Sequence, residues 1–551
     1  MKKYTIHLLI AITLIAAFLR LYRLDTIPPG INRDEASIGI TASSLVTTGK
    51  DEYGRKLPVS FESFGDWKLP LYIYTTIPFI QVFGLTELAV RLPSAIAGIV
   101  SVVGVYFLAN LLFGSQTLAL ISALSLALSP WHIHISRVES EAIVSVFLSI
   151  MGSLYFITAV RNRSLKHLIT SGVLLALTYY TYHGNHISTS LLVMGLFAIY
   201  WKDVIRIPRW WMAVGVGLCI TGIILTATFA ADHTKISGIS IFGDPTVVHA
   251  QIELPRLSHD NPDSIVAKLM HNRVTYAIVT ISQNYLRSYG PEFLFIKGGG
   301  NRAHNIQGYG NLHGIEALLL ILGVIWLMNS ILSHTHGEKQ KESKLVIWWL
   351  LLGGVASAIT KDAPHSNRML MVVPALAITA GAGAQLFIRS SLRFWKYTAI
   401  AILIIGYVAG TGYYLDRYFV HFPKYEAANW GYAYKKLTPI LFSPENSSKN
   451  IIMTHPESSP YAYILFYSGY NLSEYQKQAT RYPISRDGYT DVSGFGRFSF
   501  RPINWDTDTT TPNTLLITTA EEAPSALDPK VISRISLPTG EVQFVVIDTD
   551  K

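Results

Sequence analysis

The sequence predicts a polytopic α-helical membrane protein of about 11 transmembrane helices, followed by a small α/β domain. Of its 551 residues, 50% are hydrophobic and only 15% are charged, whereas charged residues make up roughly 25% of a typical globular domain. The mean hydropathy of +0.31 agrees with this bias. Apolar runs such as 95–113 and 314–332 supply about the 20 residues that cross a bilayer core of roughly 30 Å. A soluble, disordered or fibrous chain is therefore excluded.

The order of apolar segments and basic loops predicts the topology. Twelve apolar segments lie at 5–24, 69–86, 91–113, 117–136, 141–160, 167–185, 187–201, 210–230, 314–332, 345–360, 369–388 and 397–419. Short loops rich in Lys and Arg face the cytoplasm, so an even number of crossings must separate the basic groups at 2–3 and 161–166. Five segments lie between them, and one of these therefore does not cross. The segment 69–86 is short and holds two prolines, so we expect it to lie in the interface.

Eleven crossings remain, and they place the N-terminus inside and the C-terminus outside. The basic loops at 202–209, 339–344 and 389–396 then fall on the cytoplasmic side without adjustment. This topology leaves three large pieces on the outer side, at 25–90, 231–313 and 420–551. We therefore expect a transmembrane domain over 1–419, with outer loops 25–90 and 231–313, and an extracytoplasmic domain over 420–551.

The outer pieces carry their own secondary structure. In the tail, apolar runs at 450–453, 515–518 and 542–547 predict strands, and the stretches 425–437 and 461–470 predict helices, which together indicate an α/β domain. In the long loop, 264–288 has helical periodicity but too many polar residues to cross. A second interfacial helix is expected there.

Cysteine content and net charge exclude several other classes. The single cysteine, Cys219, lies in an apolar run, so an intramolecular disulfide or a zinc site built on several thiolates is impossible. The net charge of +9 is explained by the basic cytoplasmic loops, and no nucleic-acid partner is expected.

Ionisable residues gather at the predicted outer ends of the spans. They are Arg33, Asp34, Glu35, Asp66, Lys68, His132, His134, Arg137, Glu139, Glu141, His183, His186, Arg302, His304, Lys361, Asp362, His365 and Arg368. The cytoplasmic ends carry mainly Lys and Arg. Ionisable groups at a membrane boundary indicate a functional site, although each one could also be an anchor to headgroups. Carboxylates can act as general bases for a hydroxyl, and clustered cations can bind a lipid phosphate.

Several strings resemble the GT-C superfamily of membrane glycosyltransferases, in particular the bacterial family 39-like branch related to protein O-mannosyltransferases and lipid A aminoarabinose transferases. They are Asn32-Arg33-Asp34-Glu35-Ala36, Lys68-Leu69-Pro70-Leu71-Tyr72, Arg91-Leu92-Pro93-Ser94-Ala95, Leu111-Leu112-Phe113-Gly114 and Ser129-Pro130-Trp131-His132. The resemblance covers roughly the first 420 residues. It implies a mannosyltransferase-like enzyme of the plasma (inner) membrane that moves a hexosyl or pentosyl group from a polyprenyl-phosphate sugar to an outer-face acceptor, with inversion.

The resemblance also implies catalytic roles for three carboxylates. Asp34 matches the acidic residue that deprotonates the acceptor hydroxyl; the alternative is a helix cap. Glu35 either orients the base or acceptor, or is a first-turn acid favoured by the helix dipole. Relatives carry an acid two to four residues after the position of Arg137, and both Glu139 and Glu141 qualify, with Glu141 favoured.

Other matched positions are expected to bind the donor. Lys68, Arg302, His304, His365 and Arg368 match donor-phosphate ligands, each with headgroup binding as the alternative. The remaining pocket positions implied by the resemblance are Arg137, Glu139, Tyr182 and His186. His186 departs from the arginine that is frequent there.

The acceptor and the cofactor stay open at this point. A lipid, a glycan and a protein all remain possible acceptors, no cofactor is clearly required, and a divalent metal remains possible. The Trp-Trp-Asp-x-Gly signature of the oligosaccharyltransferase branch is absent from the sequence. Alternative functions are a lipid-linked sugar ligase of another fold and a non-enzymatic transporter or lipid-binding protein.

Overall fold

The computed structural model describes residues 3–208, 210–211, 217, 240–243, 245–333, 337–388, 393–454, 459–485 and 490–551. The chain divides into two compact units. We call Met1–Tyr22, Ser94–Ser136 and Ser140–Tyr414 the membrane unit, and Arg23–Pro93, Arg137–Glu139 and Leu415–Lys551 the loop–tail unit. Each unit is described by itself below.

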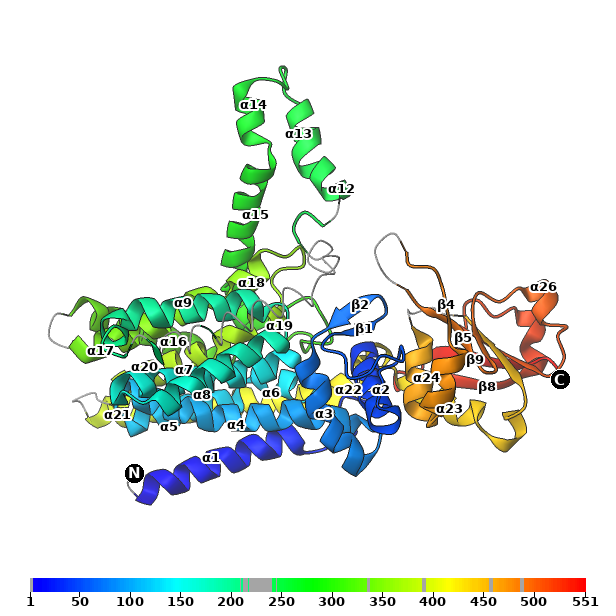
Figure 1. The fold of residues 1–551 in the computed structure, drawn as a ribbon, viewed down its shortest axis with the longest axis horizontal. Helices are drawn as coiled ribbons and strands as arrows, with labels where there is room; N and C mark the ends of the chain where they lie inside the picture. The colour runs from blue at the N-terminus through cyan, green and yellow to red at the C-terminus, as the bar shows by residue number, and fades with distance from the viewer. Residues whose placement is uncertain are drawn as a thin grey trace. The chain divides into compact units, whose positions relative to one another are not determined.

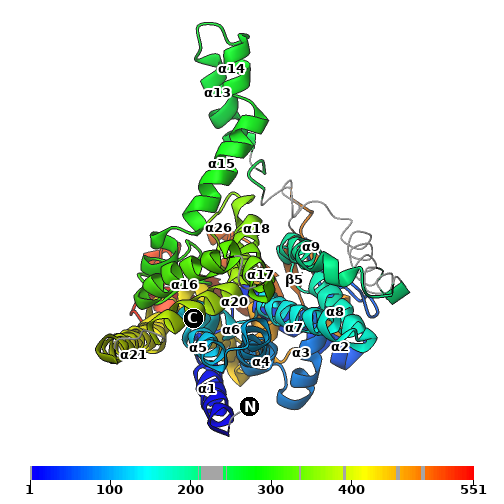
Figure 2. The ribbon, with the colours of Figure 1, turned by 90° about the vertical axis from the view of Figure 1, so that its left-hand side faces the viewer.

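The membrane unit is a bundle of long helices that run side by side in Figure 1 and are seen from one end in Figure 2. Its helices, with α4 and α21 each extending into the loop–tail unit, are α1 (Lys3–Leu21), α4 (Glu87–Phe113), α5 (Gln116–Leu128), α6 (Pro130–Ser136), α7 (Glu141–Asn162), α8 (Leu165–Leu177), η1 (Thr178–Tyr180), α9 (Asn185–Val204), α12 (Pro245–Val248), η2 (His249–Glu253), α13 (Leu254–Leu257), α14 (Ile265–Met270), α15 (Arg273–Ser288), η3 (Glu292–Ile296), α16 (Gly314–Leu332), α17 (Gly337–Gly353), α18 (Val355–Ala358), α19 (Ser366–Met369), η4 (Leu370–Val372), α20 (Val373–Ile388) and α21 (Arg393–Asp416).

Seven helical segments in the described part of the chain are long and apolar enough to cross a membrane, or eight if the bent pair α5 and α6 forms one span. The protein is therefore a multi-pass membrane protein, as the composition predicts. The count of eleven spans stays a prediction. The expected span 210–230 lies almost entirely outside the described residues, as do parts of the basic loops at 2–3, 202–209 and 389–396. Helix α8 has only 13 residues.

The expected span 117–136 is bent by 57° between α5 and α6. Pro130 opens α6 and lacks the backbone N–H that would continue the ladder of α5. Arg20 of α1 donates to the carbonyls of Leu126 and Ala127, both at 3.1 Å, and contacts His132 at 2.8 Å. A buried guanidinium thus satisfies the carbonyl groups that the bend releases.

Helices α16 and α20 approach closely because glycines face each other's backbone. A Cβ atom added at Gly323 would lie 2.0 Å from the Thr379 carbonyl oxygen, and one at Gly383 would lie 2.0 Å from that of Leu319. Small residues allow this backbone contact between membrane helices.

Helices α12 to α15 form a hairpin that protrudes across the direction of the long helices in Figures 1 and 2. The stretch expected to be an interfacial helix, 264–288, is helical as α14 and α15 with a break at His271 and Asn272. Apolar side chains on both helices are exposed, among them Ile265 and Val274. Its location in the membrane interface stays a prediction.

The loop–tail unit combines the segment after the first span with the C-terminal tail. Its elements are α2 (Arg33–Thr48), β1 (Phe61–Ser63), β2 (Asp66–Lys68), α3 (Pro70–Phe83), η5 (Arg417–His421), α22 (Phe422–Tyr425), η6 (Ala428–Trp430), α23 (Tyr432–Leu441), η7 (Pro444–Asn446), β3 (Asn450–Met453), α24 (Pro460–Ser468), α25 (Leu472–Gln478), β4 (Thr480–Arg481), β5 (Val492–Phe495), β6 (Phe498–Phe500), α26 (Trp505–Asp508), β7 (Thr514–Thr518), η8 (Ser525–Lys530), β8 (Val531–Ser536) and β9 (Val542–Asp548). Helix α3 has 14 residues, and its interfacial placement stays a prediction.

The tail is built on a mixed sheet in the order β4-β5-β6-β3-β7-β9-β8. Strand β3 pairs in parallel with β6 and β7, and the other neighbours are antiparallel. The three expected strands are confirmed as β3, β7 and β9, and they supply the buried cluster Ile452, Leu516, Val545 and Ile547. The expected helices correspond to α22–α23 and α24.

The first loop packs against this tail within the unit. Helix α2 lies against α24 and α25, and a Cβ atom at Gly30 would fall 2.2 Å from the Trp430 carbonyl oxygen. Buried polar contacts accompany this packing: Glu52 accepts hydrogen bonds from Tyr461 at 2.7 Å and from Tyr475 at 3.0 Å. The tail therefore supports the segment that carries the predicted base.

Candidate functional site

Two consecutive carboxylates, Asp34 and Glu35, lie in the first turn of α2. Asn32 caps this helix: its side chain accepts a hydrogen bond from the Glu35 amide, and the Glu35 carboxylate accepts one from the Asn32 amide. This reciprocal pair is a capping box. Because successive helical residues point about 100° apart, the two carboxylates leave the helix in different directions.

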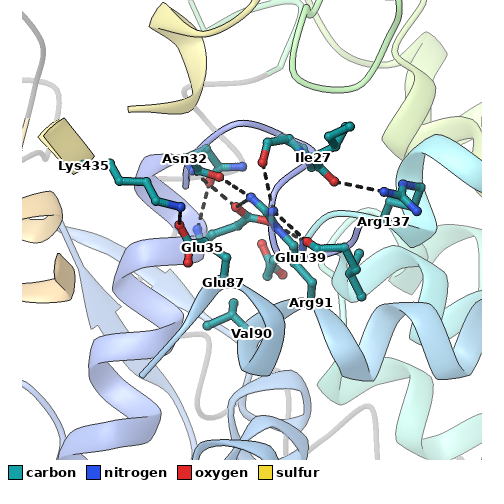
Figure 3. A network of polar contacts seen from close by, with 12 residues as sticks. Ile27, Asn32, Glu35, Glu87, Val90, Arg91, Arg137, Glu139 and Lys435 are labelled. Carbon is teal, nitrogen blue, oxygen red and sulfur yellow. Dashed lines mark hydrogen bonds and ion pairs between the residues drawn. The ribbon is translucent and has the colours of Figure 1, made fainter. Parts of the chain in front are cut away.

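Glu35 is fully buried against Arg91, which is also fully buried. Nε and one terminal nitrogen of Arg91 each donate to one Glu35 oxygen at 3.0 Å, and the Glu139 amide donates to Oε1 at 2.8 Å (Figure 3). A bidentate pair of this kind fixes geometry as well as supplying energy. Glu35 therefore stabilises the packing around Arg91 and is not accessible to a substrate.

Arg91 also fixes the loop that precedes α2. Its two terminal nitrogens donate to the carbonyls of Leu24 at 3.1 Å, of Pro28 at 3.2 Å and of Gly30. The guanidinium lies 5.6 Å from the Trp430 ring centroid, within range of a cation–π contact. One buried arginine thus joins the loop, the start of α2 and the tail.

Arg137 has a similar role in the same unit. It is buried and donates to the carbonyls of Ile27 at 3.2 Å and Arg23 at 3.4 Å. Its guanidinium lies 5.1 Å from the ring of Tyr418 and 5.0 Å from that of Phe419. These contacts support the loop and make Arg137 a positioning residue by geometry.

Asp34 points the other way and is accessible. Its side chain is 58% exposed, and Lys68 Nζ lies 3.1 Å from its Oδ1 while also donating to the Asp34 carbonyl at 3.3 Å. Lys68 ends strand β2 and is only 7% exposed, so it approaches the carboxylate from the protein side. The structure thus brings together the predicted base and a predicted phosphate ligand.

Glu139 and Glu141 fall in different units. Glu139 belongs to the loop–tail unit, where its amide binds Glu35. Glu141 opens α7 in the membrane unit, directly after the cap Ser140. The roles expected for the two carboxylates stay predictions, and the amide of Glu139 has a structural role.

Three predicted phosphate ligands gather in the membrane unit, His365 and Arg368 from the segment between α18 and α20 and His304 from the loop before α16. Arg368 pairs with Asp362 and donates to Thr360 Oγ1 at 2.8 Å. His365 Nε2 lies 3.8 Å from an Asp362 oxygen, and the rings of His304 and His365 are 5.2 Å apart.

Burial, together with the positive charge of Arg368, lowers the pKa of His365 to about 4, so this imidazole is neutral near pH 7. Burial would raise the pKa of Asp362, but the hydrogen bond and charge of Arg368 lower it overall. The cluster therefore offers one guanidinium and one neutral imidazole beside an ionised carboxylate. A bound phosphate would compete with Asp362 for Arg368.

One further predicted phosphate ligand and two of the predicted pocket residues lie in the same unit. Arg302 is exposed in the loop before α16. Tyr182 is half-buried just before α9, and His186, in the first turn of α9, contacts the Tyr179 carbonyl through Nε2 at 2.9 Å. That contact fixes the His186 ring near the end of η1.

Sequence reasoning missed two buried carboxylates and assigned no role to Arg91. Glu52 binds two tail tyrosines, as described above, and Glu87 pairs with Lys435 at 2.6 Å and accepts from Tyr467 at 3.1 Å. The partners are far away in sequence, so no local pattern points to them. A charged residue at the edge of an apolar run, as Arg91 is, was the one available signal.

No group of three or more His, Cys, Asp or Glu suited to a metal ion occurs among the residues that the structure describes. The use of a divalent metal, which the sequence leaves open, therefore stays open.

Residues 68–224 match the profile of a family described as dolichyl-phosphate-mannose-protein mannosyltransferase. A 112-residue stretch is 31% identical to YycA of Bacillus subtilis (strain 168), whose name describes a mannosyltransferase; the stretch covers 20% of this chain and 16% of that protein.

Among solved structures, ArnT from Cupriavidus metallidurans bound to undecaprenyl phosphate is similar over 100% of this chain and 98% of its own, with a TM-score of 0.54 and 12% identity. The chain has the GT-C fold. The oligosaccharyltransferase of Archaeoglobus fulgidus, tethered to an acceptor peptide, is similar at a TM-score of 0.51 and 12% identity, over 85% of this chain and 63% of its own. The chain thus spans less than two thirds of the archaeal enzyme and a small part of YycA.

Proposed function

We propose that this GT-C protein is a glycosyltransferase that moves a sugar from a polyprenyl-phosphate donor to an acceptor hydroxyl on the outer face of the plasma membrane. Asp34 is the general base, and the reaction inverts the anomeric carbon. A mannosyl-type sugar is favoured by the family match over 68–224 and by YycA. The polyprenyl-phosphate donor is favoured by the ligand named for ArnT.

The observation that carries this proposal is the contrast between the two adjacent carboxylates. Glu35 is 0% exposed and engaged on both oxygens, whereas the Asp34 side chain is 58% exposed beside Lys68. A general base must come within hydrogen-bond reach of the proton that it removes. Of these two groups, only Asp34 meets that condition.

The proposed chemistry needs an acceptor proton to be removed and a phosphate to leave. The acceptor oxygen attacks the anomeric carbon, the bond to the carrier phosphate breaks, and the proton passes to Asp34. The polyprenyl phosphate leaves as an anion, so cations on the donor side favour its departure. We assign this role to Lys68, Arg302 and Arg368, with His304 and His365 as hydrogen-bonding partners.

The alternative of a lipid-linked sugar ligase of another fold does not agree with the GT-C fold. A non-enzymatic transporter or lipid-binding protein is an outcome that the following test can give.

Asp34→Asn tests the proposal because it keeps the shape of the side chain and removes its ability to accept a proton. We expect turnover with a polyprenyl-phosphate sugar to fall by about 100-fold or more, while donor binding stays close to that of the wild type. Asp25→Asn, an exposed change in the same loop, is the control and should be neutral. Near wild-type turnover in Asp34→Asn would assign the base to another carboxylate, and no turnover in the wild type would favour the non-enzymatic alternative.

A further inference from the structure

A pocket with a volume of about 480 Å³ lies in the loop–tail unit, which also carries the proposed base. Arg33 and Phe64 of the first loop line it together with tail residues that include Tyr482, Thr490 and Asp491. We propose that this pocket binds the acceptor and that the acceptor is a short saccharide. This inference rests on the proposed function and names the acceptor class that the sequence leaves open.

Phe64 links the pocket to the surroundings of the base. Arg33 immediately precedes Asp34, and its guanidinium lies 4.8 Å from the Phe64 ring centroid. Lys68, which holds Asp34, lies 5.7 Å from the same ring. The Phe64 ring that lines the pocket is therefore in contact with the lysine that pairs with the proposed base.

The Phe64 wall is held in a fixed conformation. Phe64 and Gly65 connect β1 to β2 with φ values of 58° and 79°, the positive values of a type I′ hairpin turn. A left-handed phenylalanine is rare and needs support from its surroundings. The amide of Thr490 supplies part of it by donating to the Phe64 carbonyl at 3.2 Å.

Tyr482 provides a second rigid aromatic surface. Its hydroxyl donates to the Phe500 carbonyl at 2.7 Å, and its amide donates to the Asp491 carbonyl at 2.9 Å. The hydroxyl of Thr490 donates to the Tyr482 carbonyl at 2.7 Å. The residue is nevertheless 37% exposed. An exposed ring that is anchored at both its backbone and its hydroxyl loses little freedom when a ligand stacks on it.

The composition of the lining fits a saccharide better than the other acceptor classes. Apolar C–H faces of a sugar can pack on Phe64 and Tyr482, while its hydroxyls can bond to Arg33 and the hydroxyl of Thr490. A lipid chain would leave these polar groups without water, which is costly. A peptide bound by strand addition would use a sheet edge rather than a pocket. The volume lies within the roughly 300–1,000 Å³ of small-ligand pockets.

Tyr482→Ala tests the proposal in the full-length protein. The protein is placed in lipid nanodiscs, which avoids sugar-based detergents, and is applied without donor to an array of immobilised short oligosaccharides. We expect at least one saccharide to bind, and Tyr482→Ala to weaken that binding by about tenfold or more. Tyr425→Ala removes a tyrosine of the same unit that is 58% exposed and does not line the pocket, and it should bind as the wild type does.

A kinetic measurement completes the test. With the saccharide found on the array, Tyr482→Ala should raise the acceptor KM while leaving the affinity for the polyprenyl-phosphate sugar unchanged. The proposal is overturned if no arrayed saccharide binds, if Tyr482→Ala binds as the wild type does, or if a hydroxyl-bearing peptide or a lipid accepts the sugar with a KM that Tyr482→Ala does not change. Saccharide binding without any donor turnover would instead contradict the proposed function and leave the pocket assignment standing.

Discussion

Removing the charge of Glu35 should lower the stability of the loop–tail unit and leave Asp34, the proposed base, in place. In Glu35→Gln, the fully buried guanidinium of Arg91 keeps its bonds to loop carbonyls but loses its counter-ion. Breaking a buried ion pair by changing one partner costs roughly 3–5 kcal/mol. For a unit of this size each kcal/mol lowers the unfolding temperature by about 2–4 °C, so we expect a decrease of about 6–20 °C.

The assay is thermal unfolding of purified variants, measured together with turnover at a temperature where all of them are folded. Arg91→Met should show a similar loss. The double variant should lose less than the two single losses added together, because neither charge is then left buried alone. Glu62→Gln removes a charge that pairs with the partly exposed Arg55, and as the control it should cost less than about 1 kcal/mol.

Two results would refute this reasoning. A decrease of less than about 2 °C in Glu35→Gln would mean that the pair is not the main support of the loop. A loss of turnover equal to that of Asp34→Asn, in Glu35→Gln protein that is still folded, would mean that Glu35 takes part in the chemistry.

Three further predictions concern the donor, the pH dependence and the topology. Lys68→Met and Arg368→Met should each weaken donor binding by about 10- to 150-fold, the loss of one charged hydrogen bond, as measured by titration with a polyprenyl-phosphate sugar; unchanged affinity in both would make them membrane anchors. Burial raises the pKa of Glu52 above its ordinary value of 4.5, against the opposing effects of its tyrosine hydrogen bond and a nearby arginine. Its contribution to stability is therefore complete below about pH 4.5 and is lost as the pH rises through the higher folded-state pKa. The unfolding temperature of the wild type should fall over this pH range, and that of Glu52→Gln should fall less. Parallel pH profiles of the two proteins would contradict this prediction. A cysteine at Thr86 should react with an impermeant thiol reagent from outside, and reaction only from the cytoplasm would overturn the predicted topology.

The elements that sequence predicted well are those whose signal is local. Apolar strands such as β3 and β9 are buried on both faces and appear as continuous hydrophobic runs. Strands β5 and β6 are short, and Gly494 lies within one of them, so no comparable pattern marks them. The bend at Pro130 had a signal in the proline itself, although the segment 117–136 was expected as a single span.

The candidate site was predictable in its residue types but not in its division of roles. Asp34 and Glu35 are adjacent acids in the same helical turn, and nothing local distinguishes them. Their roles diverge because Arg91, 56 residues later, meets Glu35. The rotation of α2 that turns Asp34 outward is therefore set by a tertiary contact.

The same contacts make the position of the proposed base depend on the tail. Helix α2 packs against α24 and α25, and Gln476 of α25 donates to Ser44 Oγ of α2 at 2.8 Å. Glu52 and Glu87 flank the first loop's hairpin and α3. The carboxylates of both contact side chains of the tail. Because buried polar groups are costly to leave unpaired, loosening the tail would release these carboxylates and with them the start of α2. In the proposed function, the tail therefore acts in two ways, by fixing the base and by supplying walls of the proposed acceptor pocket.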